Sequence, residues 1–243
     1  LINRLGFNND GSEIIKKRIE NNIPYGLFGI NIGPNKDSSN MTKDFFRCAE
    51  TFFSLGDYIT INISSPNTIG LREFQKGDSL RNLLSGINEI REKSFYRKFF
   101  LLKISPDLND SNITEIIDMV LEFKIDGLIL TNTTDKNRED LLDKRKNEKG
   151  GLSGKPITDL STKLIRNFYP SLKGRAIIIG VGGVDSGKSA FDKIAAGASA
   201  IQLYTGMIYK GPTVVKKIKK ELINILKEKN INNIKDAIGS ASN

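Results

Sequence analysis

Asparagine residues recur in four short polar segments of the chain. They are Asn3 in NRLGFN, Asn31 in GINIGPNK, Asn62 and Asn67 in YITINISSPNT, and Asn132 in TNTT. An amide both donates and accepts hydrogen bonds, so several amides suit a planar ring with alternating carbonyl and N–H groups, such as a pyrimidine. Ser, Pro and Asn also form turns by themselves, but a turn in one segment does not explain the other three. We therefore interpret these segments as the polar side of a ligand pocket.

Lys103 ends an otherwise apolar run, FFLLKI, just before the turn SPD. An unpaired ammonium in a dry core is costly, so this side chain must either reach solvent or face an anion inside a site. Its place at the end of a strand favours the site.

The chain has no His and a single Cys, Cys48. These counts exclude a Cys/His metal site, a His-based catalytic triad and an internal disulfide, so any proton transfer must use another residue type. We find no apolar run near the roughly 18–20 residues needed to cross a bilayer. The net charge of +9 permits nucleic acid, an anionic membrane surface or acidic small molecules as partners, but the lysines are spread over many segments, which favours a solvated surface.

The segment GGVDSGKS, residues 182–189, fits the phosphate-loop pattern G-x-x-x-x-G-K-[ST]. A nucleotide triphosphatase also needs a later strand that ends in an acidic residue to hold magnesium, whereas the last apolar run ends in QLYTG. Glycine-rich turns after the last two strands of a barrel bind phosphate through backbone N–H groups. We therefore expect the turns VGGVDSG and YTGMIYKGP to bind a phosphate group, and Lys188 and Ser189 to begin the next helix.

Six short apolar runs alternate with segments of helical periodicity. The runs cover residues 26–32, 58–63, 99–104, 127–130, 176–181 and 200–204, and the helical segments cover residues 42–53, 79–92, 113–123, 160–168, 188–196 and 213–227. This alternation predicts a parallel sheet covered by helices, in either an open doubly wound sheet or a (β/α)8 barrel. Polar residues or glycines end nearly every strand, which favours the barrel, because a barrel collects its site from many strand ends. Asn112 is the predicted N-cap of the third helix.

The sequence thus predicts one α/β domain over residues 1–243, an incomplete (β/α)8 TIM barrel with about six of eight βα units. We expect the first two strands to be missing before Leu1, residues 3–11 to form the loop after the second strand, and residues 12–20 to form its helix. The charged stretch 135–150 predicts an extended loop, which is either a lid or a solvated insertion.

Taken in order, a set of segments resembles the dihydroorotate dehydrogenases of class 2, the quinone-linked type. These segments are residues 3–7, GINIG, NISSPNT, KISPD, DGLILTNTT, GGLSGKP, IIGVGG and GASAIQLYTG, and the resemblance covers essentially all 243 residues. It implies a barrel with non-covalent FMN that oxidises dihydroorotate to orotate in de novo pyrimidine (UMP) biosynthesis and passes the electrons to a membrane quinone. It also implies that the N-terminal helical segment of that family is absent here, so we expect this chain by itself to be unstable or inactive.

The resemblance further implies roles for individual residues. Ser65 matches the base that removes a proton from C5 of dihydroorotate while hydride leaves C6, Thr68 matches the relay for that proton, and Lys103 matches the lysine beside the flavin pyrimidine ring. The matches to the substrate pocket are Asn3, Arg4, Leu5, Gly6, Phe7, Asn62, Asn67, Asn132 and Thr133. The matches to the FMN site are Asn31, Asn62, Lys103, Thr131, Gly154, Gly183, Tyr204 and Thr205, with glycine at 183 letting the backbone approach the phosphate, and no metal site is expected.

Two other functions fit parts of the sequence. One is another FMN barrel that acts on a pyrimidine, such as a tRNA dihydrouridine synthase, and the other is a phosphate-loop nucleotide-binding protein. The synthases carry an added RNA-binding domain, whereas only a short polar tail follows residue 227. The expected partners are therefore dihydroorotate, orotate and a quinone, with no nucleic acid. For the full-length protein we expect peripheral contact with the cytoplasmic membrane, or with the mitochondrial inner membrane in a eukaryote.

Overall fold

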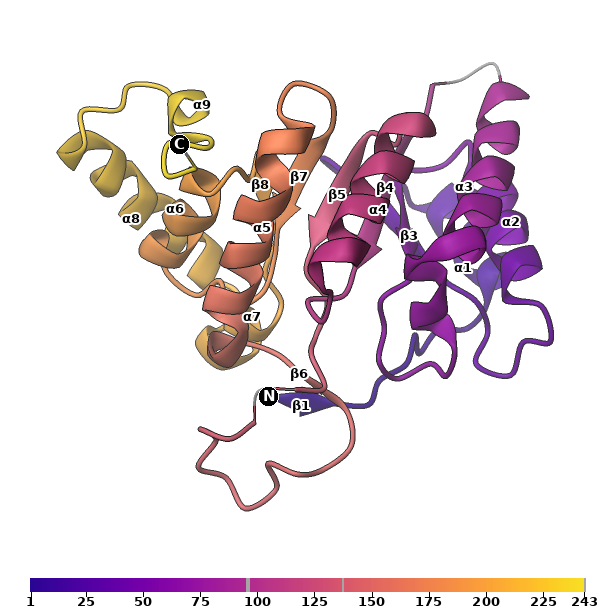
Figure 1. Ribbon diagram of the computed structural model, residues 1–243, viewed down its shortest axis with the longest axis horizontal. Helices are drawn as coiled ribbons and strands as arrows, with labels where there is room; N and C mark the ends of the chain where they lie inside the picture. Colours follow the sequence, from indigo (N-terminus) through magenta and orange to yellow (C-terminus); the bar gives the residue numbers. More distant parts are fainter. Residues whose placement is uncertain (95–96, 137, 243) are drawn as a thin grey trace.

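The computed structural model, which describes residues 1–94, 97–136 and 138–242, is built on a parallel sheet whose strands follow one another in chain order (Figure 1). The six strands of this sheet in the described residues are β2 (Gly29–Ile32), β3 (Tyr58–Asn62), β4 (Phe99–Ile104), β5 (Gly127–Leu130), β7 (Ile177–Gly180) and β8 (Ala200–Ile201). A doubly wound sheet reverses its strand order at a switch point, and this sheet does not. The predicted incomplete barrel is therefore confirmed as a half-barrel that is open between β2 and β8.

Helices lie along one face of this sheet, and most of them connect successive strands, whereas the last two pack against the helix that precedes β8 (Figure 1). They are α1 (Ser12–Asn21), α2 (Met41–Phe52), α3 (Gly77–Glu92), α4 (Asp110–Glu122), α5 (Thr158–Leu172), α6 (Gly187–Ala195), α7 (Thr205–Lys210), α8 (Val214–Glu228) and α9 (Ile234–Ala237), with short 3-10 helices η1 (Leu71–Gln75) and η2 (Lys155–Ile157).

Strand residues alternate between the helix-covered face and the inner face of the half-barrel, as the period of two requires. On β4, Phe100, Leu102 and Ile104 are buried in the main core under the helices. Leu101 packs instead with Ile129 and Ile179 in a separate small cluster. Lys103 lies two residues beyond Leu101, so its side chain belongs to the inner face at the carboxyl end of the strand.

A second, two-stranded sheet was not predicted from the sequence. Strand β1 (Ile2–Asn3) pairs antiparallel with β6 (Gly151–Leu152), with Ile2 opposite Leu152 and Asn3 opposite Gly151. Thr134, in the loop after β5, forms an isolated bridge with Leu152. Figure 1 shows this small sheet below the parallel strands, where the chain leaves β5. It therefore brings the first residues of the chain to the strand ends.

Some predicted boundaries are wrong by a few residues. The N-cap of α4 is Asn109, whose side chain accepts from the backbone N–H of Asn112 at 2.9 Å, so Asn112 lies inside the helix rather than before it. Helix α6 begins at Gly187, one residue before the predicted start, with Ser186 as its N-cap. Strand β8 ends at Ile201 rather than at residue 204.

Residues 135–150 contain no helix or strand in their described part, and Asn137 lies outside the described residues. Whether this stretch acts as a lid or as a solvated insertion remains a prediction. Within the described ranges, no helix is both long and apolar enough to cross a membrane.

Candidate active site

A cavity of about 210 Å³ lies at the carboxyl ends of β4, β5, β7 and β8. Ten of the residues predicted to bind cofactor or substrate line it together. From the cofactor set these are Lys103, Thr131, Gly154, Gly183, Tyr204 and Thr205, and from the substrate set they are Asn3, Leu5, Asn132 and Thr133. The structure therefore joins most of the two predicted sets in one place.

Asn31 and Asn62, the other two predicted cofactor residues, lie beside this cavity on neighbouring strands. Asn62 is opposite Lys103 in the register of β3 and β4. Its Nδ2 donates to Oδ1 of Asn31 at 3.1 Å. The side chain of Asn62 is buried, whereas Asn31 is exposed at the inner face. The row of strand ends thus runs from Asn31 through Asn62 to Lys103.

Asn62 also connects to the loop after β5. Its Oδ1 accepts from Nδ2 of Asn132 at 3.3 Å and from the hydroxyl of Ser64 at 3.0 Å. Asn132 accepts in turn from the backbone N–H of Thr133 at 2.8 Å. These bonds fix how the amides of Asn62 and Asn132 are oriented, and they leave the Nδ2 group of Asn31 without a donor bond among the described residues, free for a ligand.

Asn3, which lines the cavity, is held by hydrogen bonds to Asn67 and Gly151. Nδ2 of Asn67 donates to the backbone carbonyl of Asn3 at 3.2 Å, and Nδ2 of Asn3 donates to the carbonyl of Gly151 at 3.2 Å. Since Gly151 belongs to β6, the small sheet holds the loop after β3 next to the loop after β5. Oδ1 of Asn67 accepts no hydrogen bond from the described residues, so it is available as an acceptor.

Ser65 and Thr68 lie in the buried loop after β3, with exposed fractions of 7% and 4%. The hydroxyl oxygen of Ser65 accepts from the backbone N–H of Asn67 at 3.2 Å. A donated N–H stabilises negative charge on an oxygen, so this contact makes the loss of the hydroxyl proton less unfavourable. Among the described residues, the Thr68 hydroxyl has no hydrogen-bond partner and can exchange a proton with water.

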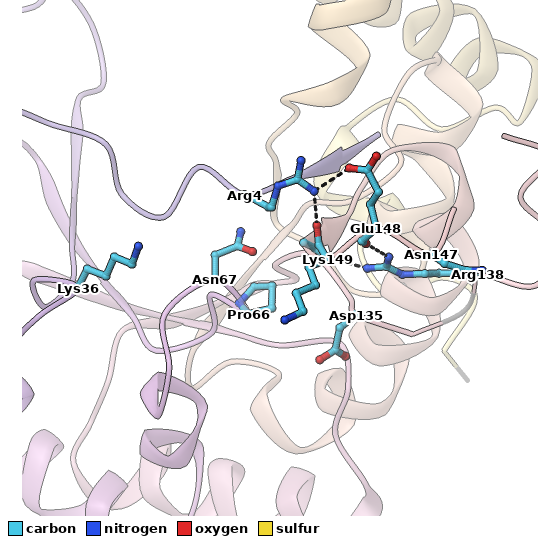
Figure 2. Close-up of a pocket in the computed structure, with 10 residues that line it drawn as sticks. Arg4, Lys36, Pro66, Asn67, Asp135, Arg138, Asn147, Glu148 and Lys149 are labelled. Carbon is cyan, nitrogen blue, oxygen red and sulfur yellow. Dashed lines mark hydrogen bonds and ion pairs between the residues drawn. The ribbon is translucent and has the colours of Figure 1, made fainter. Parts of the chain in front are cut away.

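Arg4, Gly6 and Phe7 are substrate-set residues that the structure does not place in this cavity. Arg4 lines a neighbouring cavity of about 620 Å³ together with Asn67, and Figure 2 shows it bonded to Glu148. The Arg4–Glu148 distance is 2.9 Å, in an exposed pair. Phe7 packs against the main core, and Gly6 lies next to the backbone of Asn67. Their predicted contacts with substrate stay predictions.

Lys103 has no hydrogen bond or ion pair with any residue in the described ranges, although it lines the cavity. Burial lowers the pKa of its ammonium from the ordinary value of 10.5, and no carboxylate opposes this effect. An unpaired ammonium in a cavity wall is the arrangement that a bound anion or a carbonyl-rich ring would satisfy.

The Gly182–Gly183 turn forms another wall of the cavity, and both glycines have positive φ, 110° and 74°. The backbone N–H groups of Gly183, Thr205 and Gly206 have no hydrogen-bond acceptor among the described residues, as a site for an anion requires. A Cβ atom on Gly183 would lie 1.9 Å from Oγ1 of Thr158. Position 183 therefore requires glycine because the turn packs closely on α5 behind it, as well as because a ligand must approach its backbone from the cavity.

Lys188 and Ser189 do not take part in this turn. Lys188 has 78% of its side chain exposed and pairs with Asp192 at 2.7 Å. The Ser189 hydroxyl accepts from the backbone N–H groups of Asp185 at 3.0 Å and Ser186 at 3.1 Å, completing the capping box of α6. Neither side chain is free for a nucleotide triphosphate, so the structure does not support the phosphate-loop alternative.

Arg72, in η1, was missed by the sequence analysis. Its guanidinium donates to the carbonyls of Ser64 at 3.3 Å and Thr133 at 3.0 Å, and it pairs with Asp107 at 3.1 Å and Asp135 at 3.3 Å. One side chain thus ties together the loops after β3, β4 and β5. The available signal in the sequence was Asp107 in KISPD, a carboxylate three residues after a predicted strand end, which needs a cationic partner if it is buried.

Comparison with known proteins gives consistent matches over the whole chain. A model of the dihydroorotate dehydrogenase family matches residues 1–226. A dihydroorotate dehydrogenase (quinone) of Rhodopseudomonas palustris (strain BisB5) is 42% identical in an alignment of 246 residues that covers 99% of this chain and 67% of the relative. The mitochondrial dihydroorotate dehydrogenase (quinone) of Mus musculus is 42% identical over 98% of this chain and 63% of its own length.

A solved structure agrees with these sequence matches. A crystal structure of DHODH from Eimeria tenella in complex with ferulenol has a TM-score of 0.93 and 38% identity, over 98% of this chain and 70% of that chain. The half-barrel therefore matches part of the TIM barrel of that enzyme, and the chain spans about two-thirds of the length of the relatives that it matches.

Replacing Lys103 by Met should raise the free energy of unfolding of the ligand-free protein at neutral pH, because the buried ammonium is costly there. The pKa of Lys103 is lower in the folded protein than in the unfolded chain. At a pH between these two pKa values, the unfolded chain therefore binds more protons than the folded protein does. The stability of the wild type consequently rises as the pH increases toward 10.5. The advantage of Lys103→Met should shrink over that range in urea unfolding at several pH values. Lys219→Met, at an exposed position of α8, is the control. Equal stability of Lys103→Met and wild type at pH 7 would contradict the prediction.

Replacing Arg72 by Gln should lower the free energy of unfolding by about 3 kcal/mol, because it leaves the carboxylate of Asp107 buried without its cation. The side chain of Asp107 is 7% exposed and that of Asp135 is 53% exposed. Asp135→Asn should therefore cost less than about 1 kcal/mol. Chemical denaturation of both variants measures the difference, and equal losses would show that burial does not set the strength of this network.

Proposed function

This chain belongs to the dihydroorotate dehydrogenase family, and from that premise we propose that its cavity binds FMN and dihydroorotate next to each other. The quinone type of this family oxidises dihydroorotate in pyrimidine biosynthesis, with a flavin as cofactor and a quinone as electron acceptor. The observation that carries the proposal is the shared lining: ten predicted cofactor and substrate residues surround one cavity at the strand ends.

The chemistry of the lining fits FMN. The unpaired ammonium of Lys103 lies on β4, and the unpaired N–H groups of Gly183 and Thr205 follow β7 and β8, further along the sheet. The first suits the electron-rich pyrimidine edge of a flavin, and the second suit a phosphate. The cavity of about 210 Å³ is smaller than the roughly 300–1,000 Å³ of most small-molecule sites. We therefore place part of the cofactor beyond it, along the strand ends toward Asn62 and Asn31.

When bound, FMN supplies the acceptor for the hydride that leaves the substrate. Lys103 then holds a fixed positive charge where negative charge collects, in a site that gives it no carboxylate partner. Asn132 and Asn67 orient the pyrimidine ring of the substrate, because hydrogen bonds within the site already fix their amides. The rigid amides keep the carbon that loses its proton near Ser65.

Ser65 is the base in this proposal. Its oxygen accepts the N–H of Asn67, and its side chain is buried in the loop after β3. A serine hydroxyl is a weak base, and the chain has no His to assist it. The proton must therefore leave along hydroxyl groups and water, for which the unpartnered Thr68 hydroxyl is placed three residues further along the same loop.

The quinone in the names of the relatives supports a peripheral position of this protein at a membrane, where an apolar acceptor is found. For a eukaryotic protein this would be the mitochondrial inner membrane, and otherwise the cytoplasmic membrane. Co-sedimentation of the full-length protein with lipid vesicles tests this part separately, and no binding to any vesicle would refute it.

In the full-length protein, replacing Ser65 by Ala should lower kcat by about 10²- to 10⁴-fold while FMN stays bound, because only the positioned base is lost. Anaerobic mixing with dihydroorotate measures the bleaching of flavin absorbance, and a soluble quinone analogue measures turnover. Ser65→Cys is the matched control, since a thiol ionises near pKa 8.5 and should retain activity with its pH profile moved to lower pH. Near-normal turnover of Ser65→Ala would remove Ser65 from the mechanism, and protein without bound flavin would refute the FMN site.

A further inference from the structure

Lys193, on α6, is a fully buried cation, with 0% of its surface exposed. Its Nζ donates to the carbonyl of Thr158 at 3.2 Å, to the hydroxyl of Thr162 at 2.9 Å and to the hydroxyl of Ser161. No ion pair of Lys193 occurs in the described part of the chain, and its sequence neighbour Asp192 pairs with Lys188 instead. Burial lowers the pKa of Lys193 to about 8. Such a charge is costly in a fold, so its presence needs a reason.

The residues that hold Lys193 also hold the Gly182–Gly183 turn. The nearest carbonyl acceptor of the Ser161 hydroxyl is that of Gly182 at 3.0 Å, and the alternative, the carbonyl of Thr158 at 3.1 Å, already accepts from Lys193. The Thr158 hydroxyl lies 2.8 Å from the carbonyl of Lys155 and 3.3 Å from that of Gly183, so it contacts the turn without giving it a bond of its own. All three ammonium protons of Lys193 are used on this first turn of α5. One of them goes to the Ser161 oxygen, which leaves the single proton of that hydroxyl for a carbonyl acceptor.

Because the peptide bond is planar, the hydrogen bond from Ser161 to the carbonyl of Gly182 also sets the direction of the N–H group of Gly183. In a trans peptide, the C=O of one residue and the N–H of the next point in opposite directions. Ser161 draws the carbonyl of Gly182 toward α5, so the N–H of Gly183 points away from α5, on the side of the cavity that Gly183 lines. The negative end of this peptide dipole faces Lys193, and its positive end faces the cavity.

We infer that Lys193 is a positioning residue for the phosphate of the flavin: acting through Ser161 from behind the turn, it makes the site select the phosphorylated cofactor over the unphosphorylated one. This inference rests on the proposed FMN site. Lys193 does not touch the ligand. It holds an N–H donor of the turn in place and adds a positive charge that makes no ion pair, although Asp159 and Asp192 lie near enough to act on it. A bound phosphate would therefore feel an attractive charge behind the turn.

The test compares two ligands that differ only in the phosphate, FMN and riboflavin. Fluorescence titration of the full-length protein, freed of flavin, gives the Kd of each. Lys193→Met should raise the Kd for FMN at least tenfold and leave the Kd for riboflavin within twofold. Lys188→Met removes the same charge from the same helix at an exposed position, and it should change neither Kd by more than twofold.

Several outcomes would overturn the inference. If Lys193→Met raises the Kd for FMN and for riboflavin equally, Lys193 has only a structural role. If it leaves the Kd for FMN unchanged, Lys193 does not contribute to flavin binding. If Lys193→Met does not fold, Ser161→Ala decides, since it breaks the link but keeps the charge: a loss confined to FMN supports the inference, and no loss refutes it. Wild-type protein that binds neither flavin would refute the proposed function instead, and equal binding of both would refute only the phosphate selection.

Discussion

The register between β3 and β4 is the constraint on which the site depends, because it sets Asn62 opposite Lys103. A slip of one residue would exchange the two faces of the strand. Lys103 would then enter the core, while Leu102 and Ile104, both fully buried, would move to the inner face. Each large apolar side chain contributes about 1.5–3 kcal/mol when buried, and an unpaired ammonium in the core adds a further penalty. The hydrophobic pattern of a single strand therefore fixes the position of its functional residue.

Two kinds of polar contact surround the strand ends. Arg72 and Asp107 bind loops to one another and use up their hydrogen-bonding capacity on the protein. The amides near the cavity are only partly used, and Lys103 has no partner among the described residues. This division separates the groups that hold the site in shape from those that can bind a ligand. At the glycine turn, the two roles fall on the two sides of one peptide bond. The carbonyl of Gly182 bonds to Ser161 on α5, whereas Gly183 lines the cavity.

The sequence predicted best the features that depend on local pattern. Strands Phe99–Ile104 and Gly127–Leu130 have the predicted bounds, because apolar residues fill them and polar residues or turns flank them. Strand β8 is shorter than predicted because Leu203 and Tyr204 belong to the cavity wall. Two-residue strands such as β1 carry no periodic signal. Contacts such as Lys193 to Ser161 join residues 32 positions apart, and nothing in either local segment indicates the other, whereas polar residues at strand ends could be predicted as a group.

The small sheet also bears on how the site forms. Residues of β1 meet β6 about 150 positions later in the chain, and the carbonyl of Leu1 accepts from the Ser153 backbone N–H at 2.8 Å. Contacts of such long sequence separation close a large loop and form slowly relative to helices and neighbouring strands. The half-barrel can therefore assemble before Asn3 reaches Asn67 and Gly151. In kinetic terms, we expect one wall of the cavity to be completed late in folding and to be lost first on unfolding.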